Sequence, residues 1–328
     1  MSSPSHSLPH NNLFRPAQPT PLQRFLRKPL LFIATYLYTH QPPLKQKRRN
    51  SNNSSSQSNG RTTPHHITVV CLSDTHNTQP LVPAADILLH AGDLTQNGTF
   101  AELQATLDWL AALPHRHKFV IAGNHDLLLS PSFVASAPSR VFTTTPGCTK
   151  EDLEWGDVTY LEDSSATVTV RGRDVKIWGA PWTPKYGNWA FQYPPGEDVW
   201  QGKIPGDADI VVTHGPAQGH LDVNGMGHAG CAWMGRELER VKPRLAVYGH
   251  IHEARGREYV RWDRVQRMYE GVLGCPVEGC FVFEVGVGAW VWSWVRWAFG
   301  VRREPKTTFV NSSTVGHWGV AEGMVVEM

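Results

Sequence analysis

Five short stretches of the chain carry residues that can bind metal ions. They are DTH at 74–76, GD at 92–93, GNHD at 123–126, TH at 213–214 and GHIH at 249–252. Their carboxylates, amide and imidazoles together suit borderline divalent ions such as Mn, Fe and Zn, whereas Ca and Mg prefer oxygen ligands alone. In D-x-H and H-x-H, alternate side chains of an extended segment point to the same side and can reach one cluster. The ligands are too many for one ion and about enough for two.

Each of these stretches directly follows an apolar run that has the character of a buried strand. We expect such strands at 66–73, 86–92, 117–123, 208–214 and 244–250. Because the carboxyl ends of strands in an open α/β sheet face a common crevice, residues far apart in sequence can meet there. The glycines before Asp93, Asn124 and His250 would remove side-chain bulk where backbone and ion crowd together.

Helices and further strands surround these runs. A helix is predicted from Thr99, a suitable N-cap, to Pro114, and a second helix around 231–241. The remaining expected elements are antiparallel strands within 158–180, an aromatic, proline-rich loop at 186–206 and closing strands at 309–314 and 323–328. Alternating strands and helices with added meanders predict an α/β fold arranged as a layered sandwich.

The charge of the chain is divided unevenly. The 328 residues carry a net charge of +2, yet residues 1–73 hold nine Lys and Arg and no acid, which leaves 22 basic and 29 acidic residues for the remainder. A mildly acidic body argues against a large nucleic-acid-binding surface. The five cysteines form an odd and scattered set, which indicates reduced thiols in a cytoplasmic compartment.

The N-terminal arm, residues 1–64, has a composition that predicts disorder, because its Ser, Pro, Asn and Gln cannot bury enough apolar surface. Within it, PLLFIATYLY at 29–38 is an apolar island between basic residues, too short to span a bilayer. The arm could be a mitochondrial transit peptide, a nuclear signal, an interfacial membrane anchor or a solvated tail.

A Trp-rich insert at about 262–305 interrupts the domain expected over 65–328. Four of the 13 Trp fall within eight residues of GVGAWVWSWVRWAFG, whose apolar core is too short for a clean transmembrane helix. With Arg296, Arg302 and Arg303 beside it, this segment could lie in a membrane interface, or it could pack on the sheet as a hairpin. Peripheral membrane contact through the arm or through 280–300 therefore stays open.

Taken in order, the five stretches resemble the calcineurin-like metallophosphoesterase superfamily, whose blocks are D-x-H, G-D, G-N-H-[DE], H and G-H-x-H. The resemblance covers roughly 66–256 and returns near FVNSS at 309–313. Longer strings, such as GAPWTPKYGNWAFQ and VYGHIHEARG, are similar to the metallophosphoesterase-domain-containing subfamily related to class III phosphodiesterases. The resemblance implies a metallophosphoesterase-type layered sandwich of two mixed β-sheets flanked by helices.

The resemblance also implies roles for individual residues. One divalent ion would be bound by Asp74, His76, Asp93 and His252. The second would be bound by Asp93, Asn124, His214 and His250, with Asp93 as the bridge. His125 would face the scissile phosphate and assist the leaving oxygen, while a hydroxide bridging the two metals attacks a small phosphodiester, such as a cyclic nucleotide.

One departure narrows the expected activity. Protein Ser/Thr phosphatases carry G-D-x-V-D-R-G, whereas this chain has GDLTQNG at 92–98 and lacks the second Asp and the Arg. Small nucleotides or other small phosphoesters are therefore favoured as substrates over phosphoproteins. The alternative is a membrane- or partner-binding protein with a structural or low-activity metal centre.

Other polar and aromatic residues have plainer interpretations. His65, His66, His115, His117, His220 and His228 are expected on the surface or in the core. His90 is expected to support a ligand or to pack, and Asp126 to cap the following turn. The aromatic residues Trp182, Tyr186, Trp189 and Phe191 could form a core or stack on a nucleobase.

Overall fold

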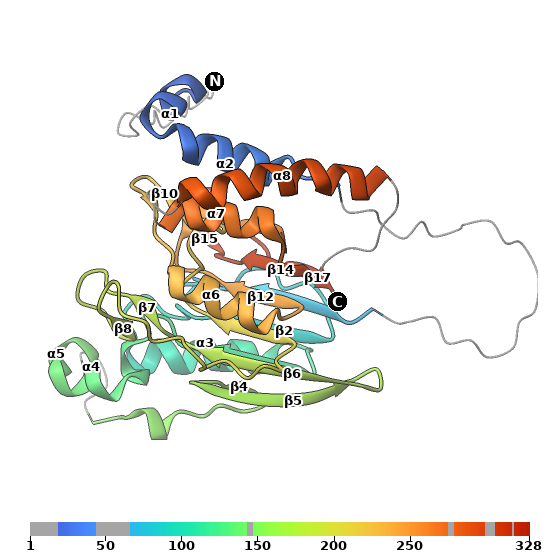
Figure 1. Cartoon of the computed structure of the whole chain (residues 1–328). Coiled ribbons are helices and arrows are strands. Elements are labelled where there is room, and N and C mark those ends of the chain that lie inside the picture. The colour runs from blue at the N-terminus through green and yellow to red at the C-terminus, as the bar shows by residue number, and fades with distance from the viewer. Residues whose placement is uncertain (1–18, 44–65, 143–146, 275–278, 299–305, 317) are drawn as a thin grey trace, which may run out of the picture.

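The computed structural model describes residues 19–43, 66–142, 147–274, 279–298, 306–316 and 318–328. Its centre consists of two mixed β-sheets (Figure 1). The first has the order β17-β1-β2-β3-β4, formed by β1 Thr68–Leu72, β2 Ile87–Ala91, β3 His117–Ile121, β4 Val158–Tyr160 and β17 Met324–Glu327. The second has the order β13-β14-β12-β9-β6-β5, formed by β5 Ser164–Val170, β6 Arg173–Ala180, β9 Ile210–Thr213, β12 Leu245–Tyr248, β13 Gly256–Arg261 and β14 Lys306–Asn311.

Both sheets are parallel in the middle, and three of their four edge strands are antiparallel. Strands β1 to β4 run parallel in the first sheet, and β6, β9, β12 and β14 run parallel in the second. The strands β17, β5 and β13 pair antiparallel with their neighbours. Because the central strands are parallel, β1, β2 and β3 all end at one edge of the first sheet, and β9 and β12 end at one edge of the second.

The core lies between the sheets. Val69, Leu89 and Ile121 of the first sheet share one buried cluster with Ile177 and Val212 of the second. Neighbouring residues of a strand point to opposite faces of the sheet. On the outer faces of both sheets these residues are also apolar, so each outer face needs a cover. Helix α3 (Phe100–Ala112) covers the first sheet and α6 (Ala232–Val241) covers the second. This arrangement confirms the predicted layered sandwich.

The start of α3 agrees with the sequence prediction. The side chain of Thr99 accepts a hydrogen bond from the backbone N of Glu102, and the Glu102 carboxylate accepts one from the backbone N of Thr99. This reciprocal pair satisfies two backbone donors that a helix leaves open at its first turn. The helix ends at Ala112, two residues before Pro114, whose ring does not fit inside a helix.

Short elements complete the described chain. They are β7 Thr183–Pro184, β8 Gln192–Tyr193, β10 Val223–Asn224, β11 Gly227–His228, β15 Val315–Gly316, β16 Gly319–Val320, α4 Pro131–Ser136, α5 Pro138–Val141, and the 3-10 turns η1 Leu127–Leu129, η2 Lys150–Asp152 and η3 His252–Ala254. The predicted loop at 186–206 is mostly irregular, with β8 inside it. Cys71, Cys148 and Cys231 are free thiols, while the side chains of Cys275 and Cys280 lie outside the described part.

Four further helices pack together on one side of the molecule (Figure 1). They are α1 Pro21–Arg27, α2 Pro29–Thr39, α7 Arg264–Gly274 and α8 Gly279–Ala298. A small buried cluster joins Ala34 and Leu37 of α2 to Val265, Met268 and Val272 of α7. None of the described helices combines the length and the apolar character that crossing a bilayer requires.

These helices correct two expectations from the sequence. Residues 21–27 and 29–39 of the arm are helical, and the apolar island that includes Ala34 finds a partner surface on α7. Residues 1–18 and 44–65 lie outside the described chain. The Trp-rich segment forms a helix that packs on α7 and α2, and it is not a hairpin on the sheet. Composition alone does not reveal this pairing, because the two partners are far apart in sequence.

A buried cluster of polar residues fastens α2 to the body. The Tyr38 hydroxyl donates a hydrogen bond to Glu258 of β13. His220 is buried beside it, with Nδ1 3.3 Å from Glu258 Oε2 and Nε2 3.2 Å from Glu270 Oε1. Burial disfavours the charged form of His220, but the hydrogen bonds of the two carboxylates outweigh it and raise the pKa of His220 to about 10.

Folding stability should therefore fall with rising pH. The pKa of His220 is higher in the folded than in the unfolded chain, so its stabilisation is complete below about pH 6.5 and lost by about pH 10. Between these limits the free energy of unfolding should drop by on the order of a few kcal/mol. Denaturant titrations across this range measure the slope, and His220→Gln should flatten it. The matched change His66→Gln, at an exposed histidine, should leave the slope as it is; equal slopes in all three proteins would contradict the assignment.

Candidate metal centre

All seven side chains expected to bind metal come together at the ends of the parallel strands. Asp74 follows β1, Asp93 follows β2, Asn124 follows β3, His214 follows β9 and His250 follows β12. The first four are almost completely buried. His76 and His252 lie two residues after Asp74 and His250 and are partly exposed. Residues separated by more than 170 positions thus share one site, as the strand pattern predicted.

The first of two ligand groups consists of Asp74, His76 and His252, whose candidate ligand atoms all lie within 4.8 Å of one another. His252 Nε2 is 3.1 Å from Asp74 Oδ1 and 3.4 Å from His76 Nε2. His76 Nδ1 donates to the carbonyl of Thr95 (3.1 Å), because a carbonyl oxygen only accepts. The lone pair of His76 Nε2 therefore faces His252, an arrangement that a cation between the two rings would stabilise.

The second group consists of Asp93, His214 and His250. His214 Nδ1 donates to the carbonyl of Ala91 (2.8 Å), so Nε2 is the atom turned into the site. It lies 3.0 Å from Asn124 Oδ1 and 3.3 Å from Asp93 Oδ2. One nitrogen faces two oxygen acceptors in a buried site, and this needs a proton or a metal ion among them.

Asp93 belongs to the surroundings of both groups. Its Oδ2 is 3.3 Å from His214 Nε2 and 3.8 Å from His76 Nε2. Its Oδ1 accepts a hydrogen bond from the backbone N of His125 (2.8 Å), which fixes the carboxylate in this orientation. The single carboxylate therefore has the position required of a bridging ligand.

The charge states of the histidines suit a cation site. Burial, assisted by the neighbouring His214, lowers the pKa of His250 to about 4, so its imidazole is neutral and can act as a ligand. Burial also opposes the charged form of His214, but the Asp93 carboxylate outweighs it and raises the pKa of His214 to about 9. Without a metal, a proton would occupy the space beside Asp93 that a divalent ion can take.

His125 has a different environment from the ligands. Its Nδ1 donates to the carbonyl of Gln96 (2.7 Å), so Nε2 is left for another partner. The ring stacks on Trp189, with ring centres 4.0 Å apart and planes inclined by 27°. His125 also lies close enough to His76 and Asp93 to form a third possible ligand group with them. Because its ring is partly exposed, His125 is better placed to contact a substrate than to bind a metal ion.

Two glycines are required by the crowding at the site. A Cβ on Gly249 would collide with Ser73 Oγ and with the Asp74 carboxylate. A Cβ on Gly123 would collide with Asp93. Nearby, Asp74, His76, Asp93 and His250 all have positive φ angles, between 44° and 65°. Non-glycine residues avoid this conformation, and it tends to persist where surrounding structure enforces it.

Asp126 corrects a sequence expectation. Its side chain makes no capping bond at the following turn. Instead, its two oxygens accept hydrogen bonds from the backbone N of Leu94, Thr95 and Gly123 and from the Thr95 hydroxyl. Asp126 thus ties the loop after Asp93 to the loop that carries Asn124. The sequence does not indicate this, because Leu94 and Thr95 lie more than 30 residues before Asp126 and Gly123 lies before it rather than in the following turn.

Other supporting residues hold Asp74 and its neighbours. The Ser313 hydroxyl donates to Asp74 Oδ2 (2.8 Å) and His90 Nε2 lies 2.9 Å from the hydroxyl of Thr75. His90 is buried, and its contact with Thr75 supports the loop between the candidate ligands Asp74 and His76. Ser313 belongs to the FVNSS stretch that the sequence analysis singled out, but its role was not predicted.

The aromatic residues divide between core and site. Phe191 is buried and Trp182 packs beside it, whereas Trp189 backs His125. Tyr186 is 62% exposed and its ring centre is 6.3 Å from that of His250, at the opening of the site. Of the remaining histidines, His115 is buried, His228 pairs with Asp222, and His66 and His117 lie at or near the surface; His65 lies outside the described residues.

Comparison with known proteins agrees with this geometry. The family model for calcineurin-like phosphoesterases matches residues 67–254, which include all seven candidate ligands. The chain belongs to the calcineurin-like phosphoesterase family. Metallophosphoesterase domain-containing protein 1 of Homo sapiens is 40% identical over 209 residues, 59% of this chain and 63% of that protein.

Two further relatives come from a fungus and a worm. A protein of Emericella nidulans named probable rhamnogalacturonate lyase C is 37% identical over 304 residues, 89% of this chain but 26% of that protein. A UPF0046 protein of Caenorhabditis elegans is 34% identical over 203 residues, 58% of this chain and 70% of that protein. The chain thus spans about a quarter of the fungal relative and less than two thirds of the human one.

Proposed function

We propose that the chain is a metal-dependent phosphoesterase that hydrolyses small phosphodiesters, with a cyclic nucleotide as one candidate substrate, and that it uses two ions of Mn, Fe or Zn. One observation supports this above all: Asp93 Oδ2 lies between His76 Nε2 and His214 Nε2, which belong to different ligand groups. Asp74 and His252 complete the first site, and Asn124 and His250 complete the second. The three free thiols support a reducing, cytoplasmic compartment.

The protein's own residues provide binding, orientation and proton transfer. When bound, the two metal ions would supply Lewis acidity and a water of lowered pKa. Asn124 and Asp93 are held in place by the loops that Asp126 ties together. Because His125 Nδ1 donates to the carbonyl of Gln96, Nε2 is the ring nitrogen that would donate a hydrogen bond or a proton to the leaving oxygen.

The loop after Asp93 supports diesters over phosphoproteins. Its residues Leu94, Thr95 and Gln96 bring no cation to the site. A phosphomonoester carries a second negative charge that such a cation would balance, while a diester carries one charge. Tyr186, exposed at the opening, is placed to contact the organic part of a substrate.

The test uses purified full-length protein, stripped of metal by a chelator and reloaded with Mn, Fe or Zn. Bound metal is measured by mass spectrometry, and turnover is compared on bis-p-nitrophenyl phosphate and p-nitrophenyl phosphate. We expect the diester to be hydrolysed faster, and a panel of 2′,3′- and 3′,5′-cyclic nucleotides then narrows the substrate. A folded, metal-loaded protein that hydrolyses neither ester would refute the proposal.

Removal of the aromatic support behind His125 gives a more specific result. Trp189→Ala should lower kcat by about tenfold with little change in KM, because His125 keeps its bond to Gln96 but loses its stacked position. Tyr186→Ala is the matched aromatic change, and it should alter KM more than kcat. Steady-state kinetics on the best diester measure both; a pure KM effect of Trp189→Ala would assign Trp189 to substrate binding instead.

A further inference from the structure

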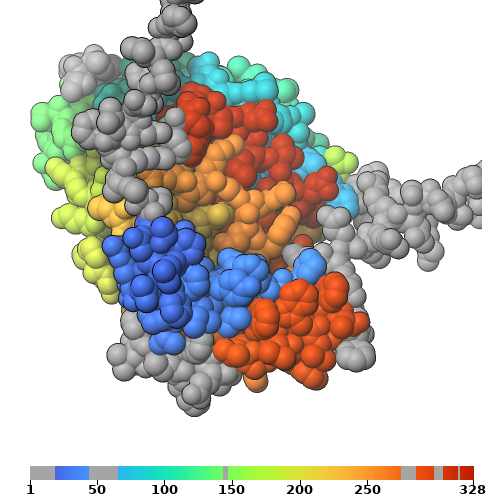
Figure 2. Space-filling view, turned by 90° about the horizontal axis from the view of Figure 1, so that it is seen from above, coloured from blue at the N-terminus to red at the C-terminus, as the bar shows by residue number. Residues whose placement is uncertain are grey.

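Three helices leave an apolar surface uncovered. Among the described residues, α1, α2 and α8 carry nine of the seventeen large apolar side chains that are exposed, although they make up a small part of the chain. The nine are Leu22, Phe25, Leu26, Tyr36, Val287, Val291, Trp292, Trp294 and Val295. Figure 2 shows α1, α2 and α8 side by side on one face of the molecule.

Helix α8 is anchored by one side and exposes the other. Gly286 sits against Met268 of α7, and Trp290 Nε1 donates to the carbonyl of His40 at the end of α2 (3.2 Å). The exposed part of the helix includes Trp292, which is 60% exposed, and Val291. The exposed apolar side is therefore held rigidly and is not a loose tail, and burying it elsewhere would release a substantial free energy.

The charges on these helices are mostly basic, and Glu284 of α8 is their one acidic residue in the sequence. Arg24, Arg27 and Lys28 lie on α1 and at its junction with α2, and Arg296 lies on α8. No Asp or Glu occurs in α1 or α2. Tryptophan combined with basic residues favours the boundary between lipid headgroups and acyl chains, since the indole has an apolar body and a polar N–H.

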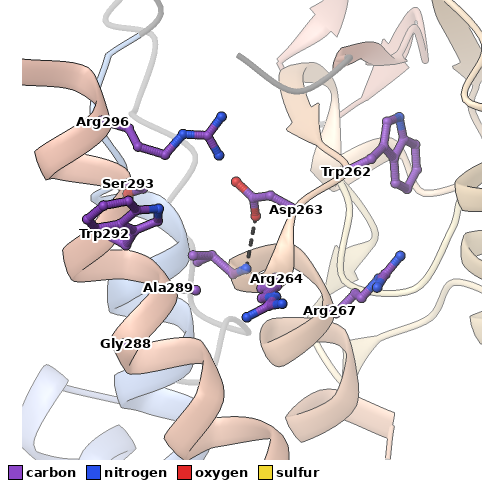
Figure 3. Close-up of a pocket in the computed structure, with 10 residues that line it drawn as sticks. Trp262, Asp263, Arg264, Arg267, Gly288, Ala289, Trp292, Ser293 and Arg296 are labelled. Atoms are coloured by element: carbon purple, nitrogen blue, oxygen red, sulfur yellow. Dashed lines mark hydrogen bonds between the residues drawn. The ribbon is translucent and has the colours of Figure 1, made fainter. Parts of the chain in front are cut away.

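A cavity of about 710 Å³ lies beside this face, between α8 and the start of α7. Figure 3 shows Trp292 and Arg296 of α8 on one side of it, and Asp263, Arg264 and Arg267 on the other. The Asp263 carboxylate accepts hydrogen bonds from the first backbone N atoms of α7, and Arg267 pairs with Glu239 (2.6 Å). The lining carries the guanidinium groups of Arg264, Arg267 and Arg296. Against the carboxylates of Asp263 and of Glu239, which pairs with Arg267, they leave a net positive charge that suits a phosphate group.

We propose that α1, α2 and α8 form a docking face for the surface of an anionic phospholipid bilayer, with the arginine-lined cavity placed to receive a lipid phosphate. The helices lie in the plane of the interface, with Leu26 and Trp292 immersed to about 5–10 Å in the headgroup–acyl boundary. Basic residues such as Arg24 and Arg296 then meet the lipid charge. This face is independent of the catalytic proposal, since it includes none of the candidate ligands.

Vesicle co-sedimentation of the full chain tests the docking face. We expect binding to phosphatidylcholine vesicles that contain phosphatidylserine, weaker binding to phosphatidylcholine alone, and weakening by salt. The double variant Leu26→Ser/Trp292→Ser should bind at least about tenfold more weakly. Leu81→Ser, which removes an equally exposed side chain away from this face (71% exposed), is the matched control and should bind like the wild type.

A charge variant provides a second line of test that leaves the apolar residues in place. Arg24→Gln/Arg296→Gln should remove the preference for phosphatidylserine. Circular dichroism confirms that each variant is folded, and hydrolysis of a soluble diester should be unchanged in all of them. The proposal is overturned if the wild type binds no anionic vesicle, or if both double variants bind as it does. It is also overturned if sedimentation velocity without lipid shows a dimer that Leu26→Ser/Trp292→Ser dissociates, since the face would then bind a second copy.

Discussion

Asp93→Asn should abolish the binding of both metal ions and lower kcat by about 1,000-fold or more, equivalent to about 4 kcal/mol of transition-state stabilisation. The reason is the position of the Asp93 carboxylate, which lies within 3.3 Å of His214 and 3.8 Å of His76, the nearest members of the two ligand groups. The amide of Asn has nearly the same size as the carboxylate and can still accept the hydrogen bond from the backbone N of His125. It lacks the negative charge that offsets two cations.

Metal analysis distinguishes a bridging role from a simple ligand role. His250→Ala removes a member of one group only, so the protein should keep about one ion per chain, while Asp93→Asn should keep none. Asp207→Asn is the control, because Asp207 is exposed and pairs with Lys176, and neither residue is a candidate ligand. If Asp93→Asn retained one ion as His250→Ala does, Asp93 would belong to a single site and the dinuclear proposal would fail.

Gly249→Ala should disable the site without touching any ligand. The added methyl group would overlap Ser73 Oγ and Asp74 Oδ2, neither of which has room to retreat in a buried loop. We expect a loss of about 2–3 kcal/mol in unfolding free energy, together with a loss of metal from the Asp74 group.

The matched glycine change lies in a helix. Gly235→Ala in α6 adds a methyl group where no atom lies within 4 Å, so it should raise stability by about 0.5–1 kcal/mol. Denaturant titration and metal content together measure both variants. Normal metal content in a stable Gly249→Ala protein would show that the loop can move aside, and the crowding argument would be wrong.

The sequence predicted that the candidate ligands would lie together because two simple rules act together. Each ligand stretch follows an apolar strand, and parallel strands bring their carboxyl ends to one edge. The predicted N-cap at Thr99 is similarly local, since its partner Glu102 is three residues away. Such features depend on near neighbours in the chain or on a general property of sheets.

The sequence could not predict features that depend on a distant partner. Asp126 binds backbone groups of Leu94 and Thr95, more than 30 residues earlier, and nothing in GNHD indicates this choice over a local cap. The stacking of Trp189 on His125 and the hydrogen bond from Ser313 to Asp74 have the same origin. In each case the contact comes from a loop, and the path of that loop is determined only by the folded chain.

The pairing of α2 with α7 has a consequence for synthesis on the ribosome. Thr39 at the end of α2 and Arg264 at the start of α7 are roughly 225 residues apart (264 − 39), so translation takes on the order of ten to forty seconds to deliver the partner. Throughout that interval the apolar segment 29–38 has no native surface to pack against. Newly made chains should therefore depend on a chaperone, or on an early encounter with lipid, to avoid aggregation before synthesis is complete.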